Sequence, residues 1–263
     1  MPRPPSRTVF VVVPGASQSP SHYGYLLHIL HSRGYPTLSA LLPSTGPAIG
    51  SNVTAQDDTD YVRERMLLPI LDTEEHDVIM VMHSYGGLPG SAAALGLGKA
   101  DRAAQGKSTS VLGQIFISAL LIKGGDGNDV ITNIGGQIPP HMGVDKAPFV
   151  LTCDDPGPPL YQDVEPKELQ DVIVMSTLCP SWASWHSPCP RASFDSEGFK
   201  DRIAFIRTVK DQCAPYDLQT MMIQGTGVEW TIKDIDTGHS PNLTAPEKLC
   251  DLLVDLAKQF EKL

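Results

Sequence analysis

The chain has 263 residues, of which 41% are hydrophobic and 19% charged, a composition that suits a globular protein with a substantial core. Its net charge of −10 comes without clusters of Lys or Arg, which argues against nucleic acid as a partner. No apolar run approaches the roughly 20 residues of a membrane-spanning helix, and the N-terminal segment does not fit a secretion signal, so we expect a cytoplasmic protein without a membrane partner.

Strands and helices are predicted to alternate along residues 1–122. Runs of β-branched and other apolar residues indicate buried strands, and apolar residues at helical spacing indicate helices. The expected strands lie at residues 8–13, 35–42, 78–82 and 111–122, and the expected helices at residues 21–33, 54–71 and 88–97. Asp57, Asp58 and Asp60 suit the positive N-terminal end of the second helix.

The regular pattern breaks from residue 123 to about residue 200, where Gly and Pro are frequent. A loop-rich stretch of this length is usually functional, and we interpret it as a cap inserted over the site. Regularity returns with strands at residues 202–211 and 227–232 and helices at residues 215–223 and 244–263. The alternation predicts a single α/β domain, residues 1–263, whose core (residues 1–122 and 201–263) is a mostly parallel sheet with helices on both faces.

One buried strand runs into a tight turn at residues 83–87, His-Ser-Tyr-Gly-Gly, and a helix of small residues follows. This arrangement is typical of the nucleophile elbow of α/β-hydrolases, with Ser84 at its apex. Gly86 suits the close approach of strand and helix, where a Cβ would collide. Met82 stands where the usual pattern has its first glycine. We expect either a slightly wider turn or small neighbours that accommodate the thioether.

A serine hydroxyl becomes nucleophilic when an imidazole takes its proton and an acid orients that imidazole. In the α/β-hydrolase arrangement the acid and then the histidine follow the serine, each in a loop after a strand. Asp211 and His239 match this order and these positions. Asp234 and Asp236 compete for the role of the acid, but they lie too close to His239 in the sequence to face it from a neighbouring strand.

Two backbone N–H groups must face the negative charge that develops on the substrate oxygen during acyl transfer. We expect one from Tyr85, directly after the nucleophile, and the other from Ala16, in the loop after the first strand. In the same loop, Gly15 lets the backbone approach the substrate and Ser17 adds a hydroxyl group to the pocket.

Aromatic residues of the cap are candidates for the wall of a substrate pocket, although they would equally suit a small core of the cap itself. These candidates are Tyr161, Trp182 and Trp185, together with His186. The other histidines are interpreted as structural or solvated, and His83 is expected to point into the sheet. No metal site or cofactor is implied, because the five cysteines are scattered and no C-x-x-C spacing is present.

Taken together, these motifs resemble the α/β-hydrolase superfamily, and within it the single-domain branch of plant methyl esterases and hydroxynitrile lyases with fungal relatives. The resemblance runs nearly end to end and is carried by residues 13–17, 22–23, 42–44, 57–58, 83–87, 161–163, 211 and 238–241. Lyases of this branch have a threonine and a lysine where this chain has Gly15 and Ser240, so both positions resemble the esterase pattern. Pro14 departs from the usual histidine.

The resemblance implies a serine hydrolase that cleaves a carboxylic ester, lactone or thioester of a small, largely apolar metabolite through an acyl-enzyme. Fungal relatives of this kind often serve secondary metabolism. The alternative is a non-hydrolytic enzyme of the same fold, a lyase, isomerase or cyclase, that uses the triad as acid and base. A third hypothesis is a binding protein on a hydrolase scaffold, which the complete set of triad residues argues against. A homodimer is left open.

Overall fold

The structure is a computed structural model that describes residues 7–47, 51–144 and 150–263. Within these residues, six strands form one sheet in the order β2-β1-β3-β4-β7-β8, and neighbouring strands are parallel throughout. The strands are β1 (Thr8–Val13), β2 (Thr37–Ser39), β3 (Asp77–His83), β4 (Val111–Ile117), β7 (Ile203–Thr208) and β8 (Thr231–Ile235). The predicted α/β class with a parallel central sheet is confirmed.

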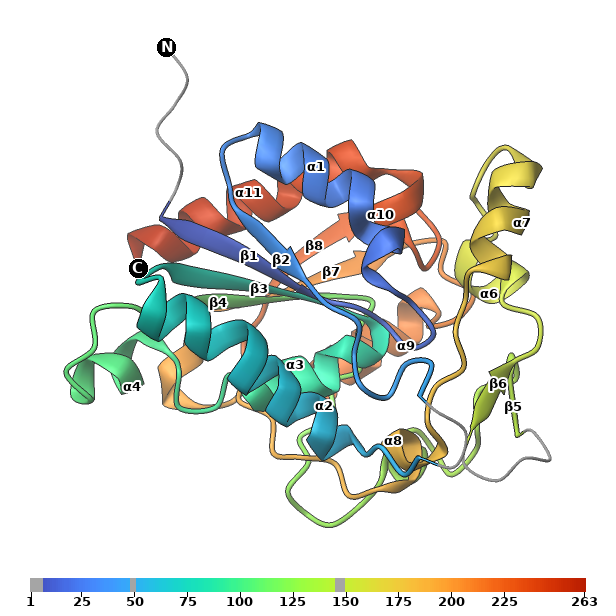
Figure 1. Ribbon diagram of the computed structural model, residues 1–263, viewed down its shortest axis with the longest axis horizontal. Coiled ribbons are helices and arrows are strands. Elements are labelled where there is room, and N and C mark those ends of the chain that lie inside the picture. Colours follow the sequence, from blue (N-terminus) through green and yellow to red (C-terminus); the bar gives the residue numbers. More distant parts are fainter. Residues whose placement is uncertain (1–6, 48–50, 145–149) are drawn as a thin grey trace.

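Helices cover both faces of this sheet (Figure 1). One face is covered by α1 (Gly24–Ser32) and α11 (Pro246–Lys262). The other face is covered by α2 (Ala55–Tyr61), its π-helical continuation (Val62–Leu67 and Pro69–Thr73), α3 (Gly87–Ala93) and α9 (Tyr216–Gly225). The short helices α4 (Lys99–Ala104) and α10 (Pro241–Thr244) lie at the edges of these layers. None of the helices in the described part of the chain has the length and apolarity that a bilayer crossing requires.

The sequence of β1 is almost entirely apolar because both faces of the sheet are covered. Successive side chains of a strand point to opposite faces. Phe10 and Val12 therefore pack in the apolar layer with α1 and α11. Val9, Val11 and Val13 pack in the layer with α2 and α3. The core consists of these two layers, one on each side of the sheet.

The last strand begins later than the sequence predicts. The expected strand spans residues 227–232, whereas β8 spans Thr231–Ile235. Trp230 lies before the strand and packs edge-on against Phe116 and Phe205, with ring centroids 5.2 and 6.2 Å apart. As the edge strand of the sheet, β8 alternates between more and less exposed residues, so polar residues belong to it. A continuous run of apolar residues therefore does not mark the position of β8 in the sequence.

Residues 123–200 interrupt the alternation between β4 and β7. They contain α5 (Val130–Asn133), β5 (Met142–Val144), β6 (Leu151–Cys153), α6 (Gly157–Tyr161), α7 (Lys167–Met175) and α8 (Trp182–His186). β5 and β6 pair antiparallel as a separate two-stranded sheet, which lies with α6 and α7 to one side of the central sheet (Figure 1). Phe194 and Phe199, near the end of the segment, pack in the same apolar layer as Phe116 and Phe205 of the sheet. The division into core and cap stays a prediction.

Candidate active site

Ser84 stands at the end of β3, in the sharp turn that leads into α3. Its φ of 52° lies in the left-handed region, which is strained for a residue that carries a side chain. Two neighbouring loops hold this turn. A Cβ on Gly86 would lie 2.6 Å from the carbonyl oxygens of Val13 and Pro14. From the other side, the Leu120 N–H donates to the Ser84 carbonyl oxygen at 3.0 Å. The strained turn presents the Ser84 side chain at the carboxyl end of the sheet.

Met82, which departs from the usual glycine of the elbow, is accommodated by a small neighbour. Its side chain is fully buried and lies against Gly90 of α3, where a Cβ would come within 2.6 Å of the Met82 sulfur. Of the two expectations for this departure, the structure has the small neighbour that makes room for the thioether.

Asp211 and His239 meet beyond the carboxyl ends of β7 and β8. His239 Nδ1 lies 2.8 Å from Asp211 Oδ2, and both side chains are buried. Because a carboxylate only accepts hydrogen bonds, Nδ1 carries the hydrogen and Nε2 is left as an acceptor. That Nε2 atom is buried and has no hydrogen-bond partner among the described residues. His239 and Ser84 line the same cavity.

Asp211 is surrounded by donors that favour its anionic form. Besides His239, the hydroxyls of Ser118 and Thr208 donate to Oδ2. The N–H groups of Cys213 and Ala214 donate to Oδ1, both at a distance of 2.8 Å. Burial alone would raise the pKa of Asp211, but the attraction of His239 and these hydrogen bonds outweigh it and hold the pKa well below its usual range. Sequence analysis missed Ser118, whose only signal is its position directly after a buried strand.

The two competing acids lie away from His239. Asp234 is on β8, where its two carboxylate oxygens lie 2.7 and 3.0 Å from the guanidinium of Arg207 on β7. Asp236 forms an ion pair with Lys210 at 2.8 Å, and both side chains are exposed. Of the three acids considered, Asp211 is the one that the structure brings to the histidine.

Both expected oxyanion donors lie in the cavity wall beside the nucleophile. Ala16 and Tyr85 line the cavity together with Ser84. Gly15 lies directly against the nucleophile, since a Cβ at Gly15 would be only 3.0 Å from Ser84 Cβ. The Tyr85 ring is held on its other side by Trp185, with the two rings stacked at 5.9 Å. The structure therefore gathers the expected donors around Ser84.

The cavity at Ser84 has a volume of about 470 Å³ and lies between the end of the sheet and residues 123–200. Its wall is mostly apolar, and the described residues that line it include no Asp, Glu, Lys or Arg. Of the expected pocket residues, Ser17 and Trp185 line the cavity. Such an uncharged wall suits an apolar small molecule with few polar groups.

Three residues of the segment 123–200 that were candidates for the pocket wall do not line this cavity. Trp182 and His186 stack on each other at a centroid distance of 3.3 Å, within α8. Tyr161 is fully buried in a separate apolar cluster that also holds Ile173. Trp182 also packs against the core of the sheet, and Tyr161 also stacks with His22 at 6.3 Å. These rings therefore serve packing rather than the wall of this cavity.

His141 is a polar cavity residue that sequence analysis interpreted as structural or solvated. Burial, and then the nearby His239, lower the pKa of His141 to about 4, so its imidazole is neutral at pH 7. Asn133 and Gln137 add amide groups to the same side of the cavity. No periodic pattern in the sequence marks these residues, because Asn133 ends the short helix α5 and the other two stand in irregular segments of the insertion.

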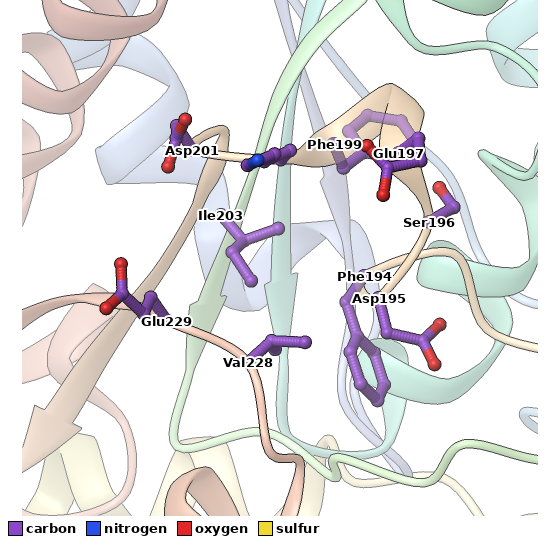
Figure 2. A pocket seen from close by; sticks show the side chains of 10 residues that line it. Phe194, Asp195, Ser196, Glu197, Phe199, Asp201, Ile203, Val228 and Glu229 are labelled. Carbon is purple, nitrogen blue, oxygen red and sulfur yellow. The ribbon is translucent and has the colours of Figure 1, made fainter.

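A second hollow of about 300 Å³ lies at the amino end of β7 (Figure 2). Acidic side chains line it, namely Asp195, Glu197, Asp201 and Glu229, around the apolar Phe194, Ile203 and Val228. Its lining residues do not include Ser84, Asp211 or His239. Ligands of open α/β sheets bind beyond the carboxyl ends of the strands, and this hollow is at the opposite end. The cavity at Ser84 is therefore the candidate active site.

Asp58 is a fully buried carboxyl group behind the elbow. Its Oδ1 accepts from the Ser44 N–H at 2.9 Å, and its Oδ2 accepts from the Tyr85 hydroxyl at 2.8 Å. Burial raises its pKa to about 6, although the hydrogen bonds from Ser44 and Tyr85 oppose the rise. Asp57, which bonds to Thr54 in a capping box, and Asp58 both lie in the first turn of α2, as expected for acids at the start of this helix.

We expect Asp58 to make the protein less stable as the pH rises. Its folded-state pKa of about 6 lies above its ordinary value of 3.8, so its stabilising contribution is present below pH 3.8 and is lost as the pH rises through 6. The loss is on the order of 3 kcal/mol of unfolding free energy. Asp58→Asn should remove this dependence, as urea unfolding at pH 4.5 and 7.5 would reveal. The control is Asp57→Asn, which should keep the pH dependence of the parent. An equal change in unfolding free energy between the two pH values for the parent and for Asp58→Asn would contradict the prediction.

Comparison with known proteins agrees with this architecture. The sequence pattern of the alpha/beta hydrolase family matches residues 10–252. A probable hydrolase, R7, from Phoma sp. is 26% identical over 96% of this chain and 99% of its own length. The alpha/beta hydrolase nvfD of Aspergillus novofumigatus is 24% identical over 95% of this chain and 97% of its own. The crystal structure of polyneuridine aldehyde esterase is similar with a TM-score of 0.73 at 17% identity, covering 95% of this chain and 99% of that one. The chain belongs to the alpha/beta hydrolase family.

Proposed function

We propose that the protein is a serine hydrolase that cleaves a neutral, largely apolar carboxylic ester, lactone or thioester. The observation that carries the proposal is the unpaired Nε2 of His239, which shares with Ser84 a cavity that has no charged side chain among its described lining residues. A charged substrate would lose its hydration there without gaining a counter-charge. Residues 123–200 supply the far wall of the cavity, and we assign them the role of the cap. The names of the relatives, hydrolases and an esterase, support the same class of reaction.

The proposed first half-reaction forms an acyl-enzyme. The Ser84 oxygen attacks the carbonyl carbon while His239 Nε2 takes its proton. The negative charge that develops on the carbonyl oxygen faces the N–H groups of Ala16 and Tyr85. The His239 cation, stabilised by Asp211, then gives the proton to the departing alcohol or thiol. In the second half-reaction water attacks the acyl group, His239 takes a proton from the water, and that proton returns to the Ser84 oxygen.

His141 favours one alternative. A second neutral imidazole in the same cavity as His239 could exchange protons with a substrate without any acyl-enzyme, as a lyase, isomerase or cyclase requires. The two candidate functions differ in the fate of water. A hydrolase run in ¹⁸O-labelled water places one labelled oxygen in the carboxylic acid product, whereas the alternative leaves the product unlabelled.

A fluorophosphonate probe tests the proposed nucleophile directly. If Ser84 is activated, its oxygen displaces fluoride from phosphorus, and intact mass spectrometry should find one adduct on the parent protein and none on Ser84→Ala. The matched control is Ser118→Ala, which removes a second hydroxyl from the same cavity wall. Because Ser118 also donates to Asp211, this variant should label more slowly than the parent but still carry one adduct, at Ser84. A folded parent that stays unlabelled, or a Ser84→Ala variant that labels equally, would overturn the proposal.

A further inference from the structure

A chain of buried hydrogen bonds connects the two loops that flank the nucleophile. The Gly15 N–H donates to the Tyr23 hydroxyl oxygen at 3.1 Å. The same hydroxyl lies 2.7 Å from His83 Nδ1, and His83 Nε2 lies 2.7 Å from the carbonyl oxygen of His239. Tyr23 and His83 are each 1% exposed. We call these four linked groups the His83 bridge. It joins the loop that carries Ala16 to the loop that carries the proposed base.

We propose that Tyr23 and His83 are positioning residues, which hold His239 and the oxyanion loop in one fixed geometry around Ser84. This role rests on the serine mechanism proposed above. It assigns a task to the histidine before the nucleophile, and to a tyrosine that is distant from Ser84 in the sequence. Neither residue lines the cavity, so both would act through the groups that they hold.

The hydrogen positions in the bridge follow from the acceptors at its ends. A carbonyl oxygen only accepts, so His83 Nε2 carries a hydrogen and donates it to His239. Burial, and then the neighbouring His239, lower the pKa of His83 to about 3, so the ring is neutral and Nδ1 is an acceptor. The Tyr23 hydroxyl carries one hydrogen, and two acceptors lie within reach of it, Gln18 Oε1 and His83 Nδ1. Gln18 Oε1 also lies 3.0 Å from His83 Nδ1, so Gln18 belongs to the same buried network between Gly15 and the His239 carbonyl.

The bridge matters because the His239 ring is otherwise held at one atom. Asp211 fixes the ring through Nδ1, and His83 fixes the backbone of the same residue from another direction. At the other end, Gly15 lies against Ser84 and next to Ala16. Displacement of reacting groups by about 1 Å can lower a rate by on the order of 100-fold. A purely structural role for His83 would instead change stability and leave the rate of the folded protein unchanged.

The test measures the labelling rate with the fluorophosphonate probe and the kcat and KM for 4-nitrophenyl acetate. Tyr23→Phe removes one oxygen and keeps the ring, so it should lower kcat and the labelling rate about tenfold while leaving KM unchanged. His83→Leu removes the donor to His239 and should lower both rates about 100-fold. His83→Gln places an amide N–H near the position of Nε2, and should recover most of the loss.

A matched control is His22→Leu, which removes another buried histidine of the same region that contacts Ser176 rather than the bridge. It should lower the unfolding temperature and leave kcat within about twofold of the parent. Rates are compared at equal concentrations of folded protein, as measured by circular dichroism. A parent that labels, with Tyr23→Phe and His83→Leu variants that label equally fast, would overturn the bridge alone. A parent that fails to label would overturn the proposed function and the bridge with it.

Discussion

Replacing Asp211 by asparagine should lower kcat by about 10³- to 10⁴-fold while leaving the fold intact. The reason is the hydrogen-bond pattern around the side chain. The N–H groups of Cys213 and Ala214 both point at Oδ1, so the amide oxygen of an asparagine would remain there. Its NH₂ group would then face His239 Nδ1. That donor would force the histidine hydrogen onto Nε2, the atom that must accept the Ser84 proton. Steady-state hydrolysis of 4-nitrophenyl acetate measures the effect.

Asp234→Asn is the matched control for this substitution. It changes the same kind of side chain on the neighbouring strand, where the carboxylate pairs with Arg207 at the edge of the sheet. The Asp234 carboxylate bonds to Arg207 and Tyr216 rather than to His239, so kcat should stay within about twofold of the parent. The assignment of the acid would be wrong if Asp234→Asn abolished turnover and Asp211→Asn preserved it.

The elbow could be predicted from sequence because its parts are contiguous. An apolar strand, a serine and two glycines stand within one short stretch, and the local sterics of a sharp turn demand that order. Asp211 and His239 could be selected because parallel strands bring their carboxyl ends to one edge of the sheet. The boundaries of β8 were harder to predict, since an edge strand keeps polar residues such as Lys233 and has no continuous apolar run.

The cavity residues of the insertion could not be assigned from sequence. Trp182 and His186 stand four positions apart on a helical turn, and their rings stack on each other. His141 reaches the cavity from an irregular segment whose course depends on tertiary packing. His83 looked like an ordinary core histidine, because its partners Tyr23 and His239 come from distant parts of the chain. Long-range contacts of this kind leave no periodic signal.

Gly86→Ala should destabilise the protein by about 3 kcal/mol or more, the upper range for overpacking, because the obstacle is backbone. The backbone of Gly86 is ordinary right-handed helix, with φ −55° and ψ −18°, so alanine suffers no torsional penalty there. The added methyl group would instead lie 2.6 Å from the carbonyl oxygens of Val13 and Pro14. Neither oxygen can rotate away, so the end of β1 must move from the elbow. Urea unfolding measures the loss.

Gly24→Ala separates this contact from the general effect of adding a methyl group. Gly24 has nearly the same backbone angles, φ −51° and ψ −43°, and no heavy atom within 4 Å of an added Cβ. Alanine in a helix is favoured over glycine by about 1 kcal/mol, so this variant should be as stable as the parent or more so. The displaced loop leads directly into Ala16, the expected oxyanion donor. The kcat of the folded Gly86→Ala protein should therefore also fall on the order of 100-fold. Equal stability of the two variants would contradict the tight contact between the elbow and the end of β1. The position of the loop that carries Ala16 would then have to depend on other contacts.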